Sequence, residues 1–223
     1  MMIHVQDLEF RYPAGSFLLS VPDLKIATGQ HSAITGESGC GKTTLLRVIS
    51  GIEMASAGSV AVDGQEISKC GDRQLRSLRN QKIGYVFQDF RLIDYLSIRD
   101  NILLPITLSS DPVVEGHGSW LEELCQATGI HQLPNHAVAR LSRGELQRVA
   151  VCRALIRQPP YLFADEPTAS LDPENGERVW DLLFSQADRI GSTIVAVTHE
   201  QSTLQRFDQV IPFAELVAGG KYG

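Results

Sequence analysis

A glycine-rich loop between a short apolar segment and a helical pattern is the feature that most constrains this fold. The segment His31–Thr35 favours a strand, residues 42–49 favour a helix, and the loop between them has the spacing Gly-x-x-x-x-Gly-Lys-Thr. Backbone N–H groups at such a helix start face an anion, and the helix dipole adds to that preference. The loop therefore predicts a phosphate-binding site. The residues expected around the phosphates are Gly36, Glu37, Ser38, Gly39, Cys40, Gly41, Lys42, Thr43 and Thr44.

The side chains at the end of this loop have separate predicted roles. Lys42 is expected to reach the β- and γ-phosphates of a nucleoside triphosphate, and the Thr43 hydroxyl is expected to coordinate Mg²⁺. Cys40 lies among the loop amides and near Lys42, where a thiolate is favoured. This cysteine is either a switch sensitive to oxidation or alkylation, or a small residue that simply fits the loop.

Two adjacent acids, Asp165 and Glu166, follow the apolar segment Tyr161–Ala164. Phosphoryl transfer to water needs a metal ion held in place and a group that orients the attacking water. Neighbouring residues of an extended chain point to opposite sides. We therefore expect Asp165 to serve the metal and Glu166 to act as general base. The alternative is a pair of acids that only begins a surface loop.

Composition argues against several classes of protein. The 223 residues carry a formal net charge of -6, which disfavours broad attraction to nucleic acid or anionic lipid. No apolar run approaches the roughly 20 residues of a membrane span. The first residues lack the basic and then apolar pattern of a signal peptide. The four cysteines are scattered, without metal-like spacing, which indicates free thiols in a reducing cytosol.

Short apolar runs alternate with helical patterns, which predicts an α/β protein with a mostly parallel sheet. We expect a P-loop NTPase core with a small antiparallel β subdomain and an inserted α-helical subdomain. One domain is expected over 1–223, with the α/β core at about 1–88 and 159–214 and the helical subdomain at about 89–158. Helices are expected at 98–104, 120–128 and 144–156, with a polar loop around 109–118. Strands are expected at 31–35, 59–62, 82–87, 161–164 and 192–197.

Further motifs resemble the ATP-binding cassette (ABC) family over almost the whole chain. The sequence Leu-Ser-Arg-Gly-Glu at 141–145 is similar to the family's signature motif. Asp172 ends a segment that resembles the family's D-loop, and Gln88 and His199 resemble its Q-loop glutamine and its switch histidine. Tyr12 stands where the family stacks an aromatic ring on adenine. The alternative for Tyr12 is an aromatic residue packed in the core.

The resemblance implies a head-to-tail dimer that clamps two ATP molecules with Mg²⁺ between its subunits. Glu166 and His199 would be the catalytic residues of each site. The metal ligands would be Thr43, Gln88 and Asp165. The nucleotide would be bound by the glycine-rich loop through Thr44 and by Tyr12, Gln88, Ser142, Gly144, Glu145 and Asp172, with the signature residues coming from the partner subunit.

Arg143 departs from the family pattern, which usually has glycine there. Ser142 and Gly144, the positions expected to contact phosphate, are kept. An arginine loses the freedom of glycine at positive φ and adds a cation near a triphosphate. We expect an active site with altered kinetics, and the alternative is a weak or silent site in an asymmetric pair. Glu145, where glutamine is commoner, can still accept a bond from a ribose hydroxyl.

The resemblance also implies a role in transport. With no membrane span in the sequence, the partners would be separate integral membrane permease subunits and a second ABC chain, identical or paralogous. The chain would lie peripherally on the cytoplasmic side of the membrane. The apolar stretch 88–96 would receive the membrane partner or would only fill the helical subdomain's core. Residues 83–92 and 98–105 look closest to the subgroup of lipoprotein release, macrolide efflux and cell division, in which ATP drives export, lipid extraction or mechanotransmission.

Two other functions stay open at this stage. A soluble ABC ATPase could act on nucleic acid or the ribosome, although the chain has neither sustained heptads nor a second cassette, and we expect no nucleic-acid partner. The chain could also be a regulatory ATP-binding subunit with little turnover. Glu166 and His199 argue against that function, whereas Arg143 is compatible with it.

Overall fold

The computed structural model describes residues 1–13, 17–109, 117–131 and 135–217. The chain divides into two compact units. The first unit consists of residues 1–79 and 195–223, and the second unit consists of residues 80–194. The single domain with a helical insertion at about 89–158 stays a prediction.

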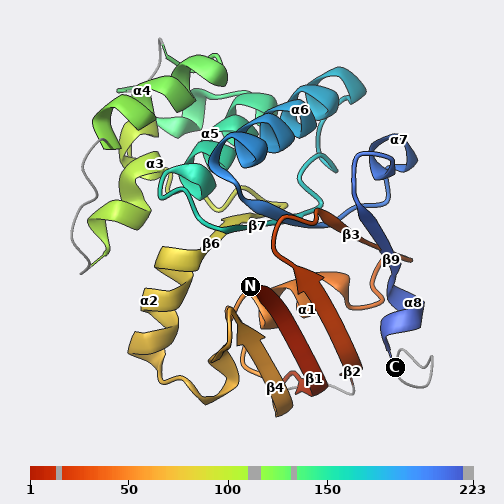
Figure 1. Ribbon diagram of the computed structural model, residues 1–223. Coiled ribbons are helices and arrows are strands. Elements are labelled where there is room, and N and C mark those ends of the chain that lie inside the picture. Colours follow the sequence, from red (N-terminus) through yellow and green to blue (C-terminus); the bar gives the residue numbers. More distant parts are fainter. Residues whose placement is uncertain (14–16, 110–116, 132–134, 218–223) are drawn as a thin grey trace. The chain divides into compact units, whose positions relative to one another are not determined.

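An antiparallel sheet with the order β2-β1-β4-β5 belongs to the first unit (Figure 1). β1 (Met2–Arg11) pairs with β2 (Leu18–Ala27) and with β4 (Ala57–Val62), and β5 (Gln65–Glu66) pairs with β4. Side chains of β1 are buried in alternation before and after an irregularity in its pairing with β4. The predicted small antiparallel β subdomain is therefore confirmed.

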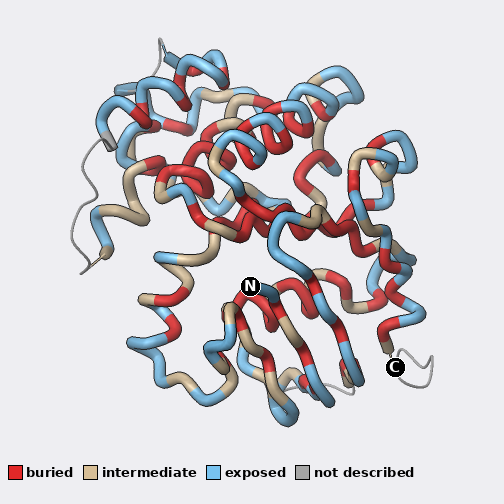
Figure 2. The backbone as a smooth tube through the Cα atoms, viewed as in Figure 1, coloured by how far each residue is buried: buried red, intermediate tan, exposed pale blue. Residues whose placement is uncertain are grey.

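The remaining strands form a sheet with the order β6-β7-β8-β3-β9. In the first unit, β3 (Ser32–Thr35) pairs in parallel with β9 (Gln209–Pro212) and with the later residues of β8 (Thr193–Val197). In the second unit, β6 (Ile83–Val86) pairs in parallel with β7 (Tyr161–Asp165). Every residue of β7 and β8 is buried (Figure 2), as expected for strands covered on both faces. The predicted α/β fold with a parallel sheet is confirmed.

The first unit contains short helices around its two sheets. They are α1 (Lys42–Ile49), the 3-10 turn η1 (Ile67–Lys69), α2 (Asp72–Lys82), which crosses the division between the units, α7 (Gln201–Leu204) and α8 (Phe213–Leu216). The helix predicted at 42–49 is confirmed, whereas α2 was not predicted.

The second unit holds the longer helices. They are α3 (Ile98–Thr107), α4 (His117–Ala127), the 3-10 turn η2 (Val138–Arg140), α5 (Arg143–Leu155) and α6 (Pro173–Ile190). α6 was not predicted, although its local signals are strong. Asp172 caps it, Pro173 occupies its first turn, and Gly191 ends it in the left-handed conformation.

The predicted polar loop is wrong at residues 117 and 118, which begin α4. Residues 110–116 lie outside the described part.

The position of α5 depends on a glycine in β6. A Cβ atom on Gly84 would lie 2.3 Å from the Ala154 carbonyl oxygen, so only glycine allows this approach of strand and helix. At the same end of α5, the Trp120 indole N–H donates to the Leu155 carbonyl at 3.2 Å. These contacts hold the helix whose other end carries the signature-like motif.

Among the described residues, no helix has both the length and the apolar character that a membrane crossing requires.

Candidate active site

The predicted site residues are divided between the two units. The first unit holds Tyr12, the glycine-rich loop and His199. The second unit holds Gln88, the signature-like motif, the two acids and Asp172. The structure brings residues together within each unit as follows.

In the first unit, the Lys42 side chain folds back onto its own loop. Its ammonium group donates to the carbonyl oxygens of Gly36 at 2.9 Å and Glu37 at 2.6 Å, and it lies 3.8 Å from the Cys40 sulfur. Lys42 is only 4% exposed and Cys40 is 5% exposed. The loop therefore holds a cation at its centre by means of its own carbonyl groups.

The helix that follows the loop begins without a side-chain cap. Its N-cap residue is Gly41, at φ 112°, and its first turn contains no acidic residue. The first amides of a helix have no partner within the helix, so an uncapped start is suited to an anion. Gly41 has a φ of 112°, which disfavours any side chain, and a Cβ atom there would lie 2.8 Å from the end of the Phe17 ring, which would have to shift.

Tyr12 lies next to this helix start. Its hydroxyl lies 3.1 Å from the Thr44 hydroxyl, and its ring contacts the rings of Phe10 and Phe17, with centroids 4.8 and 5.9 Å away. Tyr12 is half-buried. The ring is thus packed on its own unit, and its stacking on adenine stays a prediction.

His199 lies at the same edge of the first unit as the glycine-rich loop. β3 and β8 run parallel, with Ile34 opposite Val197, so Gly36 and His199 each follow two residues beyond a paired position. The Thr198 amide donates to the Ile34 carbonyl at 3.4 Å, which continues the pairing beyond β8. The His199 side chain is exposed.

In the second unit, the same geometry brings Gln88 and the two acids to one edge. Val86 of β6 lies opposite Ala164 of β7, so Gln88 and Glu166 each follow two residues beyond this pair. Gln88 is exposed, Glu166 is half-buried, and Asp165 is 2% exposed. Their backbone positions therefore lie at the same edge of the β6–β7 pair.

Each acid has a distinctive environment. The Tyr85 hydroxyl donates to the Asp165 carboxylate at 3.4 Å, and its ring lies 4.3 Å from the Phe87 ring and stacks on Phe163 at 6.2 Å. Glu166 has a φ of 44°, in the left-handed region that a residue with a Cβ atom rarely adopts. Such backbone strain costs about 1–3 kcal/mol, and it is found preferentially at functional sites.

The signature-like motif forms the capped start of α5. The Ser142 hydroxyl donates to the Glu145 carboxylate at 2.7 Å, the Ser142 amide donates to the same oxygen at 2.8 Å, and the Glu145 amide donates to the Ser142 hydroxyl at 3.4 Å. This is a complete capping box. The hydrogen bonds from Ser142 lower the pKa of the Glu145 carboxyl, so it is ionised at neutral pH.

Arg143 occupies the first position of α5, and its φ is not positive. The conflict expected from replacing a flexible glycine therefore does not arise in this structure. The Arg143 side chain is exposed. Across the described residues, no carboxylate forms an ion pair with it.

Asn175 joins the D-loop-like segment to this helix. Asp172 accepts hydrogen bonds from the Asn175 amide at 3.1 Å and from its side chain at 2.7 Å, and these bonds lower the pKa of Asp172. A Cβ atom on Gly144 would lie 3.3 Å from the Asn175 side-chain oxygen. Sequence reasoning missed Asn175, whose signal was its position three residues after an N-cap aspartate.

The segment after Gln88 is held by two buried polar residues that the sequence analysis did not single out as functional. The Arg153 guanidinium donates to the carbonyls of Arg91 and Phe90 at 2.5 and 2.6 Å, and both of these residues have positive φ. Burial lowers the pKa of Arg153 to about 10. Asn101, fully buried, accepts from the Ile93 amide at 2.8 Å and donates to the Ile93 carbonyl at 3.0 Å.

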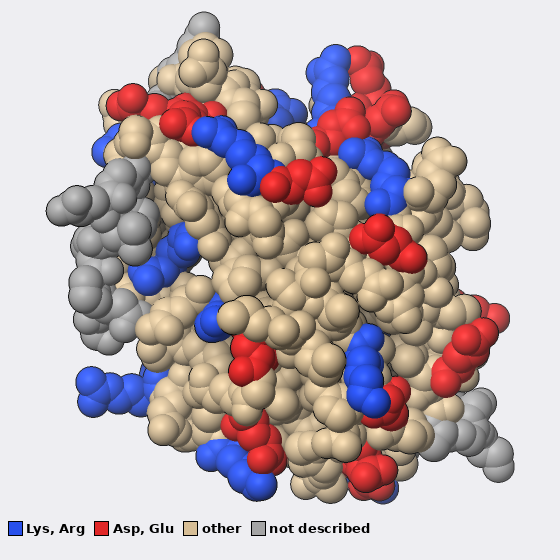
Figure 3. All heavy atoms as spheres, in the orientation of Figure 1, with Lys and Arg blue, Asp and Glu red and all other residues tan. Residues whose placement is uncertain are grey.

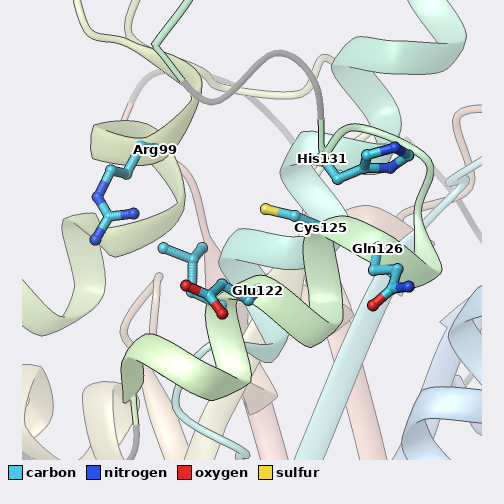
Figure 4. Close-up of a pocket in the computed structure, with 6 residues that line it drawn as sticks. Arg99, Glu122, Cys125, Gln126 and His131 are labelled. Carbon is cyan, nitrogen blue, oxygen red and sulfur yellow. The ribbon is translucent and has the colours of Figure 1, made fainter.

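A cavity of about 290 Å³ elsewhere in the second unit contains none of the predicted site residues (Figure 4). Leu121 and the Cys125 thiol are buried in its wall, and burial raises the pKa of that thiol. Arg99, Glu122 and His131 are exposed around it. Burial therefore disfavours the thiolate form of Cys125.

A phosphate-binding loop between strand and helix, with two acids at the end of a buried parallel strand, defines a phosphate-loop ATPase. Comparison with known proteins gives the family. The ABC transporter family matches residues 19–169 of the chain. The chain belongs to the ABC transporter family, in which it is an ATP-binding and ATP-hydrolysing cassette.

Individual relatives agree with this assignment over most of the chain. The lipoprotein-releasing system ATP-binding protein LolD of Bacteroides fragilis (strain YCH46) is 35% identical over 210 residues, covering 94% of this chain and 96% of that protein. The uncharacterized ABC transporter ATP-binding protein YbbA of Escherichia coli (strain K12) is 37% identical over 194 residues, covering 87% of this chain and 85% of that protein. A dimeric post-hydrolysis structure of the ATP-binding cassette MJ0796, bound to ADP and Pi, has a TM-score of 0.86 and 30% identity, covering 99% of this chain and 96% of that chain. The predicted resemblance to the ABC family and its lipoprotein-release subgroup is confirmed.

Proposed function

We propose that two copies of this chain, or this chain and a paralogue, close head-to-tail around two ATP molecules with Mg²⁺ and so drive separate membrane permease subunits. Among such complexes, the proposal favours release of a lipid-modified or hydrophobic cargo, or a mechanical action on it. The dimeric cassette with ADP and Pi supports the first part, and the relative named for lipoprotein release supports the second.

The observation that carries the proposal is the uncapped start of α1. This helix presents amides with no side-chain cap, and Lys42 lies within the loop that precedes it. A triphosphate that enters the loop replaces the carbonyl partners of the ammonium group with phosphate oxygens, which are stronger, charge-assisted acceptors. Tyr12, Thr44 and the loop residues 36–41 complete the proposed nucleotide contacts on this unit.

The residues proposed for the metal ion fit the chemistry of Mg²⁺. Thr43, Gln88 and Asp165 offer a hydroxyl, an amide oxygen and a carboxylate, the hard oxygen donors that Mg²⁺ prefers. Asp165 is buried, and its carboxylate accepts a hydrogen bond from the Tyr85 hydroxyl at 3.4 Å. When bound, Mg²⁺ neutralises charge on the phosphates.

Glu166 is the proposed general base, and His199 is the proposed contact to the γ-phosphate. Glu166 has a strained backbone, with a φ of 44°, and is half-buried, whereas the adjacent Asp165 is buried. The two neighbouring carboxylates therefore differ in exposure, as the division into base and metal ligand requires. The signature residues Ser142, Gly144 and Glu145, with Asp172, are proposed to complete the partner subunit's site.

The segment after Gln88 is proposed to receive the membrane subunit. Tyr95 is 86% exposed and Leu108, at the end of α3, is 76% exposed, although Ile98 and Ile102 of the same helix are fully buried. On the face shown in Figure 3, acidic and basic side chains of the described residues are interspersed rather than gathered into one basic surface. This face therefore does not offer the continuous basic surface by which proteins bind nucleic acid.

The test begins with the purified full-length chain. Wild type is expected to hydrolyse ATP in the presence of Mg²⁺, and E166Q is expected to bind ATP and elute as a dimer in size-exclusion chromatography. With ADP, the same variant is expected to elute as a monomer. A monomeric E166Q protein at saturating ATP would contradict the identical pair and would leave a paralogous partner to be tested by co-expression.

The membrane role is tested with tagged E166Q in gently solubilised native membranes with ATP present. Recovery of a multi-span membrane protein is expected, and the size of its extracytoplasmic domain separates transport from mechanical action. Recovery of only ribosomal or nucleic-acid components would overturn the membrane role and leave the ATP-driven dimer intact.

A further inference from the structure

The second unit holds another cavity, of about 660 Å³, which is bounded by the end of α4, by α5 and by α6. α5 contacts both of the other helices, and the three lie in one group in Figure 1. The lining residues all belong to this unit, and the volume is within the range of about 300–1,000 Å³ that is usual for ligand sites. The charged and amide side chains in its wall are Gln126, Arg148, Asn175, Arg178, Asp181 and Gln186.

Arg148 provides an unpaired cation in this wall. It is half-buried, its Nε atom is buried without a hydrogen-bond partner, and its side chain forms no hydrogen bond or ion pair within the described part of the chain. Arg178, in contrast, is exposed and donates to Glu174 at 2.6 Å. A buried donor without an acceptor is unfavourable, and a carboxylate can accept two parallel hydrogen bonds from a guanidinium. Arg148 is therefore suited to the carboxylate of a ligand.

Gln186 provides an unpaired acceptor in the same wall. It is only 8% exposed, and its side-chain oxygen has no hydrogen-bond partner. The complementary group on a ligand is an N–H donor. Asp181 adds a carboxylate to the wall, which favours N–H groups and disfavours a ligand that is only anionic, such as phosphate. The wall therefore asks for a carboxylate and for N–H donors in the same ligand.

We propose that this cavity binds the carboxyl end of a short peptide or protein segment. Arg148 binds the terminal carboxylate, and Gln186 accepts from a peptide N–H group. A free amino acid offers the same pair of groups on a smaller scale, and the volume of the cavity favours the longer ligand.

Asn175 connects this cavity with the segment that resembles the D-loop. It lies in the wall, and its amide and side chain donate to Asp172 at 3.1 and 2.7 Å. A Cβ atom on Gly144 would lie 3.3 Å from its side-chain oxygen. An occupant that contacts Asn175 therefore acts at the starts of both α5 and α6. Resting on the proposed function, such an occupant is expected to change the rate of ATP hydrolysis about fivefold or more.

The first experiment is isothermal titration calorimetry on the purified full-length chain without nucleotide. The probes are trialanine with a free carboxyl group, trialanine with a terminal amide, free alanine and inorganic phosphate. Free trialanine is expected to bind with a Kd of about 1 mM or below. Its amide is expected to bind about tenfold or more weakly, because the hydrogen bonds to a charged group are lost.

Each probe has an outcome that contradicts the proposal. No binding of free trialanine, or equal binding of its amide, would overturn the carboxylate site. Alanine that binds as tightly as trialanine would identify a free amino acid as the ligand and overturn the peptide. Phosphate that binds as tightly as trialanine would overturn the ligand class.

The matched variants are R148M and R157M. Arg157 is also half-buried and also has a buried nitrogen without a partner, but it does not line the cavity. R148M is expected to weaken trialanine binding about 10- to 100-fold. R157M is expected to stay within about twofold of wild type, since it is not in contact with the ligand. Equal losses in the two variants would overturn the role of Arg148.

Q186M tests the acceptor and separates binding from folding. It keeps the length of the side chain and removes the unpaired oxygen. Trialanine binding is expected to weaken about threefold or more. The Tm of the free protein is not expected to fall, because a buried polar atom without a partner is removed. A lower Tm with unchanged binding would show that Gln186 is only structural.

The same titration separates this inference from the proposed function. If wild type hydrolyses ATP and trialanine does not bind, this inference fails alone. If trialanine binds and wild type does not hydrolyse ATP, the proposed function fails alone. If both occur and saturating trialanine leaves the hydrolysis rate unchanged, the connection through Asn175 is overturned.

Discussion

The starts of α1 and α5 resemble each other in sequence and differ in structure. Each begins with a basic residue after a short polar segment that contains glycine or serine. At α1 no side chain caps the helix, and the cation is 4% exposed and bonded to loop carbonyls. At α5 a capping box engages the amides of Ser142 and Glu145, and the cation is exposed.

The two helix starts therefore differ both in capping and in the exposure of their first basic residue. At α1 no side chain caps the helix, and the Lys42 ammonium is held by the carbonyl groups of the loop. At α5 the Ser142 and Glu145 side chains bond to each other and to each other's amides. The following predictions separate these two cases.

The largest expected effect comes from E166Q, which stops hydrolysis and so allows both helix starts to be compared while ATP is bound. Loss of a general base is expected to lower kcat about 10²- to 10⁴-fold. Nucleotide affinity, measured by calorimetric titration, is expected to change little. Turnover within tenfold of wild type would show that another group activates the water.

The next largest effect is expected from K42A, which removes the cation of α1. ATP affinity is expected to fall about 100-fold or more, since one ammonium contacts two phosphates through charge-assisted hydrogen bonds. The matched control is K69A, which removes an exposed lysine paired with Glu66 at 2.8 Å. Equal losses in both variants would mean that affinity depends on overall charge and not on the α1 start.

A third prediction concerns the rigidity of the loop before α1. G41A is expected to lower the free energy of unfolding by about 2–4 kcal/mol, because left-handed strain adds to the contact with Phe17. The control is G129A, at φ 72° with nothing within 4 Å of the added atom, which is expected to cost about 1–2 kcal/mol. Urea unfolding measures both, and equal values would show that Phe17 moves aside.

The smallest expected effect concerns the capping box of α5 and its dependence on pH. The folded state lowers the pKa of Glu145 below its ordinary value of 4.5. Its stabilising contribution is therefore complete above pH 4.5 and is lost as pH falls through the lowered value. The Tm of wild type is expected to fall more steeply between about pH 5 and 3 than that of E145Q. Parallel curves would show that the box is not formed in solution.

Much of the fold could be predicted from local patterns. The glycine-rich loop, the apolar strands 161–164 and 192–197 and the helix 42–49 carry their signals within a few residues, and the structure agrees with each. The start of α4 could not be placed, because the two glycines of the Gly116-His117-Gly118 sequence have low helix propensity.

The site was predictable where a role depends on residue type and spacing, and less so where it depends on partners distant in sequence. Lys42 could be located at a helix start, and Gln88, Asp165, Glu166 and His199 could be located at or just after strand ends, but their roles stay predictions. The hydrogen bonds between Ser142 and Glu145 follow from a capping-box spacing that the sequence contained. The contacts of Arg153 with Phe90 and Arg91 span more than 60 residues, and no local pattern indicates them.

The contacts of Arg153 and Asn101 have a mechanical consequence. They join the segment after Gln88 to α5 and to α3 by several short hydrogen bonds within the second unit. The segment is stiff, because deforming it would break these hydrogen bonds and leave buried polar groups without partners. A displacement of this segment would therefore move α3 and α5 with it. Of these two helices, α5 is the one that begins at the signature-like motif.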